Sequence, residues 1–347
     1  MQLYNKINGK ILKEQLGKST QKRITLSFYK YHRIGNPALF RDHLYKLLED
    51  LAVLGRIYVA SEGINAQISI PESNLNNFKS SIEEIVFLKG NRLNIAFEDN
   101  GKSFFKLKIK VRPKILADGL HDDSFDVTRI GKHLNAMEFN QLAEMEDTII
   151  VDMRNHYESE IGRFKNAFYP DADTFREALA VVRENLESHK EKNIIMYCTG
   201  GIRCEKASAY FKHVGYQHVY QLEGGIIKYA RDVQKMGIEN KFIGKNFVFD
   251  ERLGERISDD IIARCHQCGK PCDTHTNCKN VACNLLFIQC KTCESKYEGC
   301  CSSSCQEIIH LPEEDQKKRR KNKDDKARIF TKGRILRPYY RYELQEK

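Results

Sequence analysis

One cysteine of this 347-residue chain lies at a point where a strand should end and a helix should begin. Cys198 follows the apolar run 194–197 and precedes Gly200 and Gly201, and a helix-like stretch begins near Glu205. Paired glycines let the backbone turn tightly, so several N–H groups and the helix dipole can converge on the sulfur and favour its thiolate. The sequence therefore predicts a strand–turn–helix unit that carries a reactive cysteine.

The length of this loop separates two kinds of cysteine chemistry. Phosphotyrosine-type phosphatases place a histidine before the cysteine and an arginine six steps after it, whereas here Tyr197 comes first and Arg203 follows Cys198 at five steps. The shorter loop resembles that of a rhodanese, whose cysteine carries a terminal sulfur as a persulfide. We predict that Cys198 and Arg203 are catalytic. The expected supporting residues of the loop are Thr199, Gly200, Gly201, Ile202 and Cys204, the last as a resolving or supporting thiol.

Two separated segments support the resemblance to rhodaneses. Upstream, an apolar strand ends in Asp152-x-Arg154, and downstream, the segment 222–226 matches the last strand-to-helix turn of that fold. Residues 162–164 read Gly-Arg-Phe where rhodaneses usually have Gly-His-Ile, a departure that leaves the cysteine loop intact. Three matches in the same order predict a rhodanese-like domain.

Helical and strand segments alternate between residues 125 and 237, which predicts a parallel sheet covered by helices. Ligands bind such sheets at the carboxyl ends of the strands, so we expect Asp152 and Cys198 to share one cleft. Fixing the end of the strand is the favoured role for Asp152, Arg154 and Glu158.

The first 118 residues follow a different pattern, strand–helix–strand–strand–helix–strand with one added strand, which predicts a ferredoxin-like domain. The expected strands are 24–29, 56–60, 64–70, 93–97 and 104–111, and the expected helices are 38–54 and 75–86. Because fold alone fixes no function, this domain is either an RNA-positioning module or a scaffold for the catalytic domain. The fold class is thus a multidomain α+β and α/β protein.

Ten of the twelve cysteines crowd into the region 244–312. Clustering with C-x-x-C spacing in a chain without a signal peptide favours a metal site over disulfides, and two such knuckles can hold one tetrahedral zinc ion. The predicted zinc ligands are Cys265, Cys268, Cys290 and Cys293. The residues Cys272, His275, Cys278, Cys283, Cys300, Cys301 and Cys305 can complete a second site, whose pairing the spacing leaves open.

The basic charge of the chain is concentrated in its final segment, 313–347. Twelve lysines and arginines and two acids between Lys317 and Arg341 leave an excess of ten positive charges, equal to the formal net charge of the whole chain. Cations interleaved with aromatic residues suit phosphate contact and base stacking. The predicted nucleic-acid contacts are Lys317, Lys318, Arg319, Arg320, Lys321, Arg334, Arg337 and Arg341. A solvated charge run is the alternative.

No stretch approaches the eighteen or so apolar residues of a membrane span, and no basic segment followed by an apolar run opens the chain. We therefore expect a cytoplasmic protein without a membrane partner. No obligate protein partner is evident from the sequence.

The whole chain, from the segment 61–65 through the loop CTGGIRCEKA to the cluster CHQC and CKTCESKYEGCC, resembles the rhodanese-like tRNA uridine hydroxylases. The resemblance implies oxygen-dependent 5-hydroxylation of the wobble uridine of tRNA, with Cys198 as the essential cysteine and molecular oxygen as co-substrate. No flavin or dinucleotide fingerprint and no iron-binding triad stands out, so a further redox cofactor stays unidentified.

The residues alone leave several mechanisms and functions open. Cys198 can act as a persulfide or sulfenate, or it can add to the electrophilic carbon of the pyrimidine ring. A rhodanese-type sulfurtransferase working through a Cys198 persulfide is one alternative to the hydroxylase. A non-catalytic adaptor that binds zinc and RNA is another, although the intact Cys198 and Arg203 argue against it.

Overall fold

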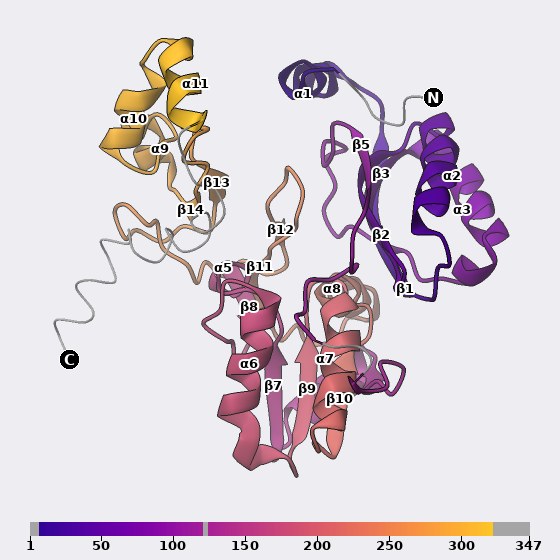
Figure 1. The fold of residues 1–347 in the computed structure, drawn as a ribbon. Helices are drawn as coiled ribbons and strands as arrows, with labels where there is room; N and C mark the ends of the chain where they lie inside the picture. The colour runs from indigo at the N-terminus through magenta and orange to yellow at the C-terminus, as the bar shows by residue number, and fades with distance from the viewer. Residues whose placement is uncertain (1–6, 121–123, 322–347) are drawn as a thin grey trace.

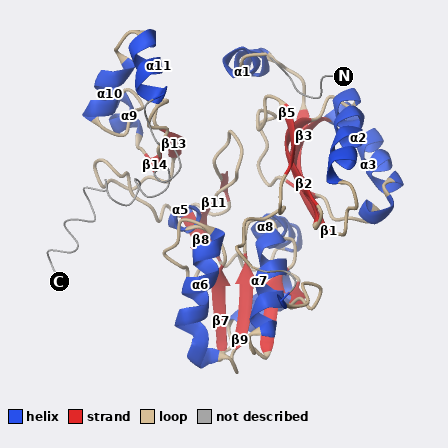
Figure 2. Ribbon diagram, in the orientation of Figure 1, coloured by secondary structure: helices blue, strands red, loops and turns tan. Residues whose placement is uncertain are grey.

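The computed structural model describes residues 7–120 and 124–321 and confirms the expected fold class (Figure 1). Three parts follow one another along the chain (Figure 2). They are an N-terminal, mainly antiparallel sheet with two helices on one face, a central parallel sheet with helices on both faces, and a cysteine-rich part with short strands and helices. Helix α1 (Gly9–Lys18) precedes the first sheet and was not predicted from the sequence.

The N-terminal sheet has the strand order β4-β1-β3-β2-β5, in which all neighbours are antiparallel except β2 and β5. Its strands are β1 (Arg23–Tyr31), β2 (Leu54–Ala60), β3 (Gly63–Pro71), β4 (Asn94–Ile95) and β5 (Leu107–Val111). Its helices are α2 (Pro37–Asp50) and α3 (Leu75–Glu84), with single 3-10 turns at Glu72–Asn74 and Val86–Leu88. This is the predicted ferredoxin-like arrangement with one strand added at the edge.

The two faces of this sheet differ in character because alternate side chains of a strand point to opposite sides. Leu26 and Phe28 of β1 lie in the apolar core beneath α2 and α3, together with Leu44 and Phe78 of these helices. Polar and aromatic side chains occupy the other face, which lies on the side of the sheet away from α2 and α3 (Figure 1). This open face carries Ser27, Tyr29, Arg56, Tyr58, Asn65 and Gln67, which the strand register brings together.

The central sheet is parallel, with the strand order β6-β10-β9-β7. Its strands are β6 (Lys132–Leu134), β7 (Thr148–Asp152), β9 (Asn193–Tyr197) and β10 (His218–Leu222). The helices of this part are α4 (Ala136–Ala143), α5 (His156–Ile161), α6 (Phe175–Leu186), α7 (Ile202–His213) and α8 (Gly225–Met236), with a 3-10 turn at Glu187–His189. The short elements β6 and α5 were missed by the sequence pattern.

Two apolar clusters sandwich the central sheet, as expected for a parallel sheet with both faces covered. Ile194 and Met196 of β9 pack beneath α6 and α7, whereas Ile195 and Tyr197 pack beneath α4 and α8. By the same alternation Cys198, the next residue, belongs to the α6 and α7 side.

The cysteine-rich part joins the central domain through a three-stranded sheet. Strand β11 (Phe242–Asn246) pairs with β8 (Gly162–Phe164) of the central domain and with β12 (Glu255–Arg256), so the strand spans the predicted boundary at residue 244. Further along lie β13 (His275–Asn277), β14 (Leu286–Ile288), α9 (Lys291–Tyr297), α10 (Ser303–Ile309) and α11 (Glu313–Lys321).

Candidate active site

The loop after β9 holds the Cys198 sulfur at the start of α7. The Gly201 N–H donates to Cys198 Sγ at 3.1 Å, and Gly201 has the left-handed φ of 102° that this tight turn requires. The carbonyl oxygen of Cys198 accepts the Ile226 N–H of α8 at 3.0 Å. A Cβ at Gly225 would lie 2.5 Å from that oxygen, so only glycine allows α8 to approach the loop so closely.

Several groups together favour the thiolate of Cys198. Burial by itself raises the pKa of this thiol, but hydrogen bonding with Cys204, the positive charge of Arg203, and the N–H groups of Arg203 and Gly201 outweigh it and lower the pKa to about 6. The pKa of Cys204 is raised well above its usual value by burial and by the neighbouring sulfur, so Cys204 stays protonated. The Cys204 thiol can therefore donate a hydrogen bond to the Cys198 thiolate.

Arg203 is held by a carboxylate that the sequence did not mark as functional. Its guanidinium donates to both carboxylate oxygens of Glu158, at 2.6 and 2.8 Å, and both side chains are buried. Glu158 also accepts the Asn155 N–H at the start of α5, at 3.0 Å. The Asn155-x-x-Glu158 spacing of a capping box is the signal that could have placed Glu158 at a helix start. The pair fixes the arginine charge beside Cys198.

Asp152 and Cys198 do not share a cleft, contrary to the expectation from the strand ends. Asp152 is fully buried, where its carboxylate accepts from Arg154 Nε and Nη2 at 2.9 and 2.6 Å and from the Tyr197 hydroxyl at 2.7 Å. Arg154 Nη2 also donates to the Gly162 carbonyl at 2.6 Å. These contacts point the carboxylate into the domain and fix the strand end, the role that the sequence favoured.

A cavity of about 410 Å³ opens over Cys198 between the central domain and the open face of the N-terminal sheet. A volume of this size is typical of small-molecule and nucleotide sites. Loop residues 198–200 form one wall, and Tyr29, Tyr58, Asn65, Gln67 and Asn94 form the opposite wall. Residues 248–250 close a third side. The sequence could not reveal this wall because it comes from another domain.

Direct contacts fasten the N-terminal domain to the cysteine loop. Asn94 Nδ2 donates to the Gly200 carbonyl at 3.2 Å, and the Tyr29 hydroxyl donates to Glu205 Oε1 at 3.1 Å. The ammonium of Lys206, buried on α7, lies 2.8 Å from Glu62 Oε2 of the N-terminal domain. A buried ion pair between domains fixes their relative position, because separation would leave a charge unpaired. The N-terminal domain is therefore part of the site.

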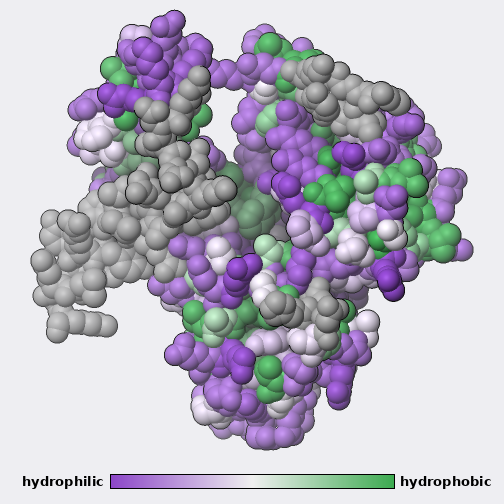
Figure 3. Space-filling view, viewed as in Figure 1, coloured by the Kyte–Doolittle hydropathy of each residue, from purple (hydrophilic) through white to green (hydrophobic). Residues whose placement is uncertain are grey.

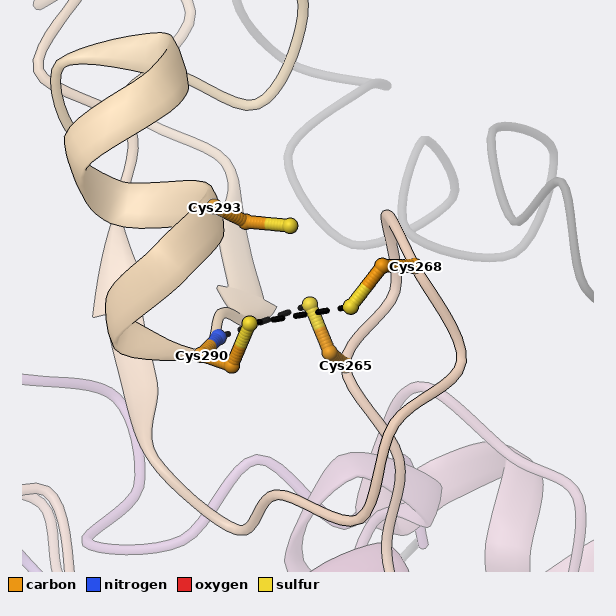
Figure 4. A group of neighbouring side chains, drawn as sticks. All are labelled: Cys265, Cys268, Cys290 and Cys293. Atoms are coloured by element: carbon orange, nitrogen blue, oxygen red, sulfur yellow. Dashed lines mark hydrogen bonds between the residues drawn. The ribbon is translucent and has the colours of Figure 1, made fainter.

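The four predicted metal ligands lie together in the cysteine-rich part. Figure 4 shows the sulfur atoms of Cys265 and Cys268, on a loop, facing those of Cys290 and Cys293 at the start of α9. All four sulfur atoms lie within 4.8 Å of one another, with 3.6 Å between Cys268 and Cys290. Four thiols at such distances can hold a tetrahedral metal ion.

A second set of four sulfurs has the same form. Cys278, Cys283, Cys301 and Cys305 place their sulfur atoms within 4.8 Å of one another, the last two flanking Ser302, the N-cap of α10. Neither set includes the buried residues Cys272, His275 and Cys300. The His275 ring packs edge-on against Phe247, with 5.2 Å between the ring centres. Cys301 lies just before α10 and Cys305 in its first turn, and no spacing in the sequence separates this set from the other cysteines of the region. All twelve cysteines are free thiols.

The basic tail falls mostly outside the described residues. Lys317 and Lys318 lie on α11, within 3.3 and 3.5 Å of Glu313 and Asp315, and Arg319 is exposed on the same helix. The side chains of Arg320 and Lys321 and the residues Arg334, Arg337 and Arg341 are not among those described. None of the described helices combines the length and the apolar character needed to cross a lipid bilayer.

The fold and the cysteine loop define a rhodanese-like protein with an N-terminal sheet domain and a cysteine-rich end. Residues 23–115 match the family described as UPF0176 acylphosphatase like domain, residues 135–232 the Rhodanese-like domain, and residues 243–306 the family described as Rhodanase C-terminal. A rhodanese-like domain protein from Staphylococcus aureus of known structure is 27% identical, covers 28% of this chain and 90% of its own, and superposes with a TM-score of 0.24.

Within this class the chain belongs to the tRNA uridine(34) hydroxylase family, as the resemblance implied. Proteins named tRNA uridine(34) hydroxylase from Photorhabdus laumondii and from Yersinia pestis are each 55% identical to it. The match extends over 96% of this chain and over 95% and 94% of these relatives, respectively.

Proposed function

We propose that this protein hydroxylates the wobble uridine of tRNA at C5 in an oxygen-dependent reaction, with Cys198 as the catalytic cysteine. The observation that carries the proposal is a buried thiol of lowered pKa on the wall of a nucleotide-sized cavity. The relatives that are 55% identical are named tRNA uridine(34) hydroxylase, and the match covers nearly their full length.

Besides a persulfide or sulfenate at Cys198, the site allows the Cys198 thiolate to add to C6 of the uracil ring. The new C–S bond moves the electron pair of the C5–C6 double bond toward C5 and O4, so C5 becomes nucleophilic. Transfer of one oxygen atom of O2 to C5 then takes two electrons from an external reductant and two protons, and the second oxygen atom leaves as water. Loss of the C5 proton and expulsion of the thiolate restore the C5–C6 double bond. The N–H groups of the loop and Arg203, held by Glu158, stabilise negative charge beside the sulfur.

The remaining predicted roles complete the proposal. We expect a cytoplasmic enzyme with four parts. The sheet domain spans residues 1–118 and the catalytic domain 125–237, and the metal-binding part (244–312) and the basic tail (313–347) follow. The first set of four thiols, Cys265, Cys268, Cys290 and Cys293, would hold structural zinc, and Cys278, Cys283, Cys301 and Cys305 would hold a second ion. Zinc suits four thiolates and brings no redox chemistry, which fits a structural role.

Nucleoside analysis of tRNA tests the proposal. A strain that lacks this gene and every other route to the modification should regain 5-hydroxylated wobble uridine when it receives the intact gene. Regain of a thiolated base in its place would favour sulfur transfer through a Cys198 persulfide, and no change in any nucleoside would favour the adaptor.

The basic tail would supply affinity for tRNA. The ten net positive charges between Lys317 and Arg341 would release counterions from phosphates, so removal of residues 317–347 should weaken tRNA binding and flatten its salt dependence. A salt series of binding measurements on the intact and the truncated protein checks this. Equal affinity of both proteins across the series would contradict a role for the tail.

A further inference from the structure

We propose that the open face of the N-terminal sheet binds the single-stranded RNA that carries the target base, with Lys108 and Lys110 of β5 and Lys106 just before the strand contacting successive phosphates. This inference rests on the proposed function and deepens it, because it assigns the path by which the anticodon loop reaches Cys198. The sequence left the role of this domain open.

The cations lie in a row because residues two apart on a strand point to the same side. The Cα atoms of Lys108 and Lys110 are about 6.6 Å apart along β5, close to the distance between successive phosphates of an extended nucleic-acid strand. Lys108 and Lys110 are exposed, whereas Leu107 and Ile109, which alternate with them along the strand, are buried in the core. Lys108 pairs in register with Arg56, and Lys110 with Tyr58.

Positive charge predominates around this row of lysines. The pKa of Lys108 is lowered by partial burial and by the neighbouring charges of Lys106, Lys110 and Arg56, which exceed the opposing effect of Glu251. Glu251 itself forms an ion pair with Lys13 at 2.7 Å. No described carboxylate forms an ion pair with any of the three lysines of the row. Phosphate groups would relieve this repulsion, which is the charge complementarity that identifies an RNA backbone.

The row also leads to the active site. A second cavity, of about 420 Å³, lies between β5 and the segment 247–253 and is lined by Lys106 and Lys108. It shares Arg56, Phe104, Phe249 and Asp250 with the cavity over Cys198. The two cavities therefore adjoin, and Figure 3 shows the molecule hollowed between the N-terminal domain and the cysteine-rich part. A nucleotide next to the target base fits the second cavity while the base itself lies over Cys198.

Aromatic rings on the same face favour a single strand over a duplex. Tyr58 lines the cavity over Cys198, and Arg112 at the end of β5 lies with its guanidinium carbon 5.8 Å from the centre of the Tyr58 ring. Phe104 and Phe249 line both cavities. Unpaired bases of a loop can stack on such rings, whereas the bases of an A-form duplex are inaccessible to them.

The test measures binding of an anticodon stem-loop RNA to the full-length protein across a salt series. The triple variant K106Q/K108Q/K110Q should bind about tenfold more weakly near physiological salt, and its salt slope should be smaller by about two, because each phosphate contact on a single strand contributes about 0.7. The control variant K46Q/K79Q/K89Q loses the same charge from exposed lysines on α2, on α3 and next to the 3-10 turn that follows α3, and should bind as the wild type does. Matching melting temperatures confirm that all three proteins fold.

The outcomes separate the two proposals. Undiminished binding by the K106Q/K108Q/K110Q variant, while the wild type binds the stem-loop, overturns the sheet face as the binding site and leaves the hydroxylase intact. Equal weakening by both triple variants overturns it as well, because the effect would then be one of net charge. Failure of the wild type to bind the stem-loop at low salt contradicts the sheet face and the tRNA substrate together. A fully paired RNA of the same length should bind more weakly than the stem-loop.

Discussion

The cysteine loop and the cysteine-rich part use the same side chain under opposite electrostatic conditions. Around Cys198 the neighbours are N–H groups and Arg203, and the one nearby sulfur, Cys204, stays protonated. In each cluster of the cysteine-rich part, four sulfurs lie within 4.8 Å of one another. Four thiolates at such distances repel one another unless a cation lies between them, whereas one thiolate among donors is stable by itself. The surroundings of a thiol therefore decide between catalysis and metal binding.

The largest expected effect is on the catalytic thiol. Cys198→Ser should lower hydroxylation on the order of a thousandfold or more, because a serine hydroxyl is not ionised at neutral pH. The side-chain volume hardly changes, so the protein should fold normally. Mass spectrometry of tRNA nucleosides from a complemented strain measures the activity, and circular dichroism checks the fold. Full hydroxylation by this variant would remove Cys198 from the mechanism.

Metal removal should affect only the cysteine-rich part. Elemental analysis of protein purified without chelator should find two metal ions per chain, and their removal should destabilise the cysteine-rich part by on the order of 10 kcal/mol per ion. Limited proteolysis should then cleave after residue 250 first, while the central domain resists. Loss of the central domain at the same chelator concentration would show that the two regions are not independent.

Single substitutions sharpen this prediction. Cys290→Ser should lower the metal content by one ion per chain, because Cys290 belongs to the first set of four sulfurs. Cys272→Ser is the matched control, since Cys272 is buried in the same part of the chain but outside both sets. A metal content of two in both variants would refute the ligand assignment.

The pH dependence of alkylation should separate Cys198 from an ordinary thiol. Because its pKa is lowered to about 6, Cys198 stays a thiolate above that pH, and its reaction with iodoacetamide should slow as the pH falls through 6. An unperturbed thiol loses its reactivity around pH 8.5. Rates measured by peptide mass spectrometry from pH 4.5 to 9 give the midpoint. A midpoint near 8.5 would contradict the proposed stabilisation.

The smallest expected effect concerns the neighbour of the thiolate. Cys204→Ala removes a donor to the sulfur and should raise the pKa of Cys198 by about one unit, since a hydrogen bond to a charged group contributes about 1.5 kcal/mol. Cys204→Ser retains a donor and should leave the midpoint of the alkylation profile closer to that of the wild type. Identical profiles for the two variants would show that Cys204 acts through packing alone.

The sequence predicted the local chemistry of the loop but not the orientation of its neighbours. Cys198, its glycines and Arg203 were recognisable because a strand, a tight turn and a helix start are encoded by adjacent residues. Asp152 was expected in the cleft, yet its carboxylate turns inward because Arg154 and Tyr197 satisfy it there. Glu158 was expected only to fix the strand end, because Arg203, the residue it holds, lies 45 positions away in the sequence.

The two sets of four sulfurs show the same division. The two C-x-x-C knuckles identified Cys265, Cys268, Cys290 and Cys293, because each knuckle fixes the distance between its own two sulfurs. The second set could not be separated from Cys272, His275 and Cys300 by spacing alone. Only the packing of the loop after β13 against α10 brings Cys278 and Cys283 to Cys301 and Cys305.

The amino-acid sequence by itself determined the class of each domain, the cysteine loop and the first set of four neighbouring thiols, since hydrophobic period, turn residues and short spacings act over a few residues. Only the tertiary structure decided which face of the N-terminal sheet meets the cysteine loop. That choice depends on Asn94, Tyr29 and Glu62 reaching partners more than 100 residues away. Contacts at such separation form when whole domains dock, so no local pattern encodes them.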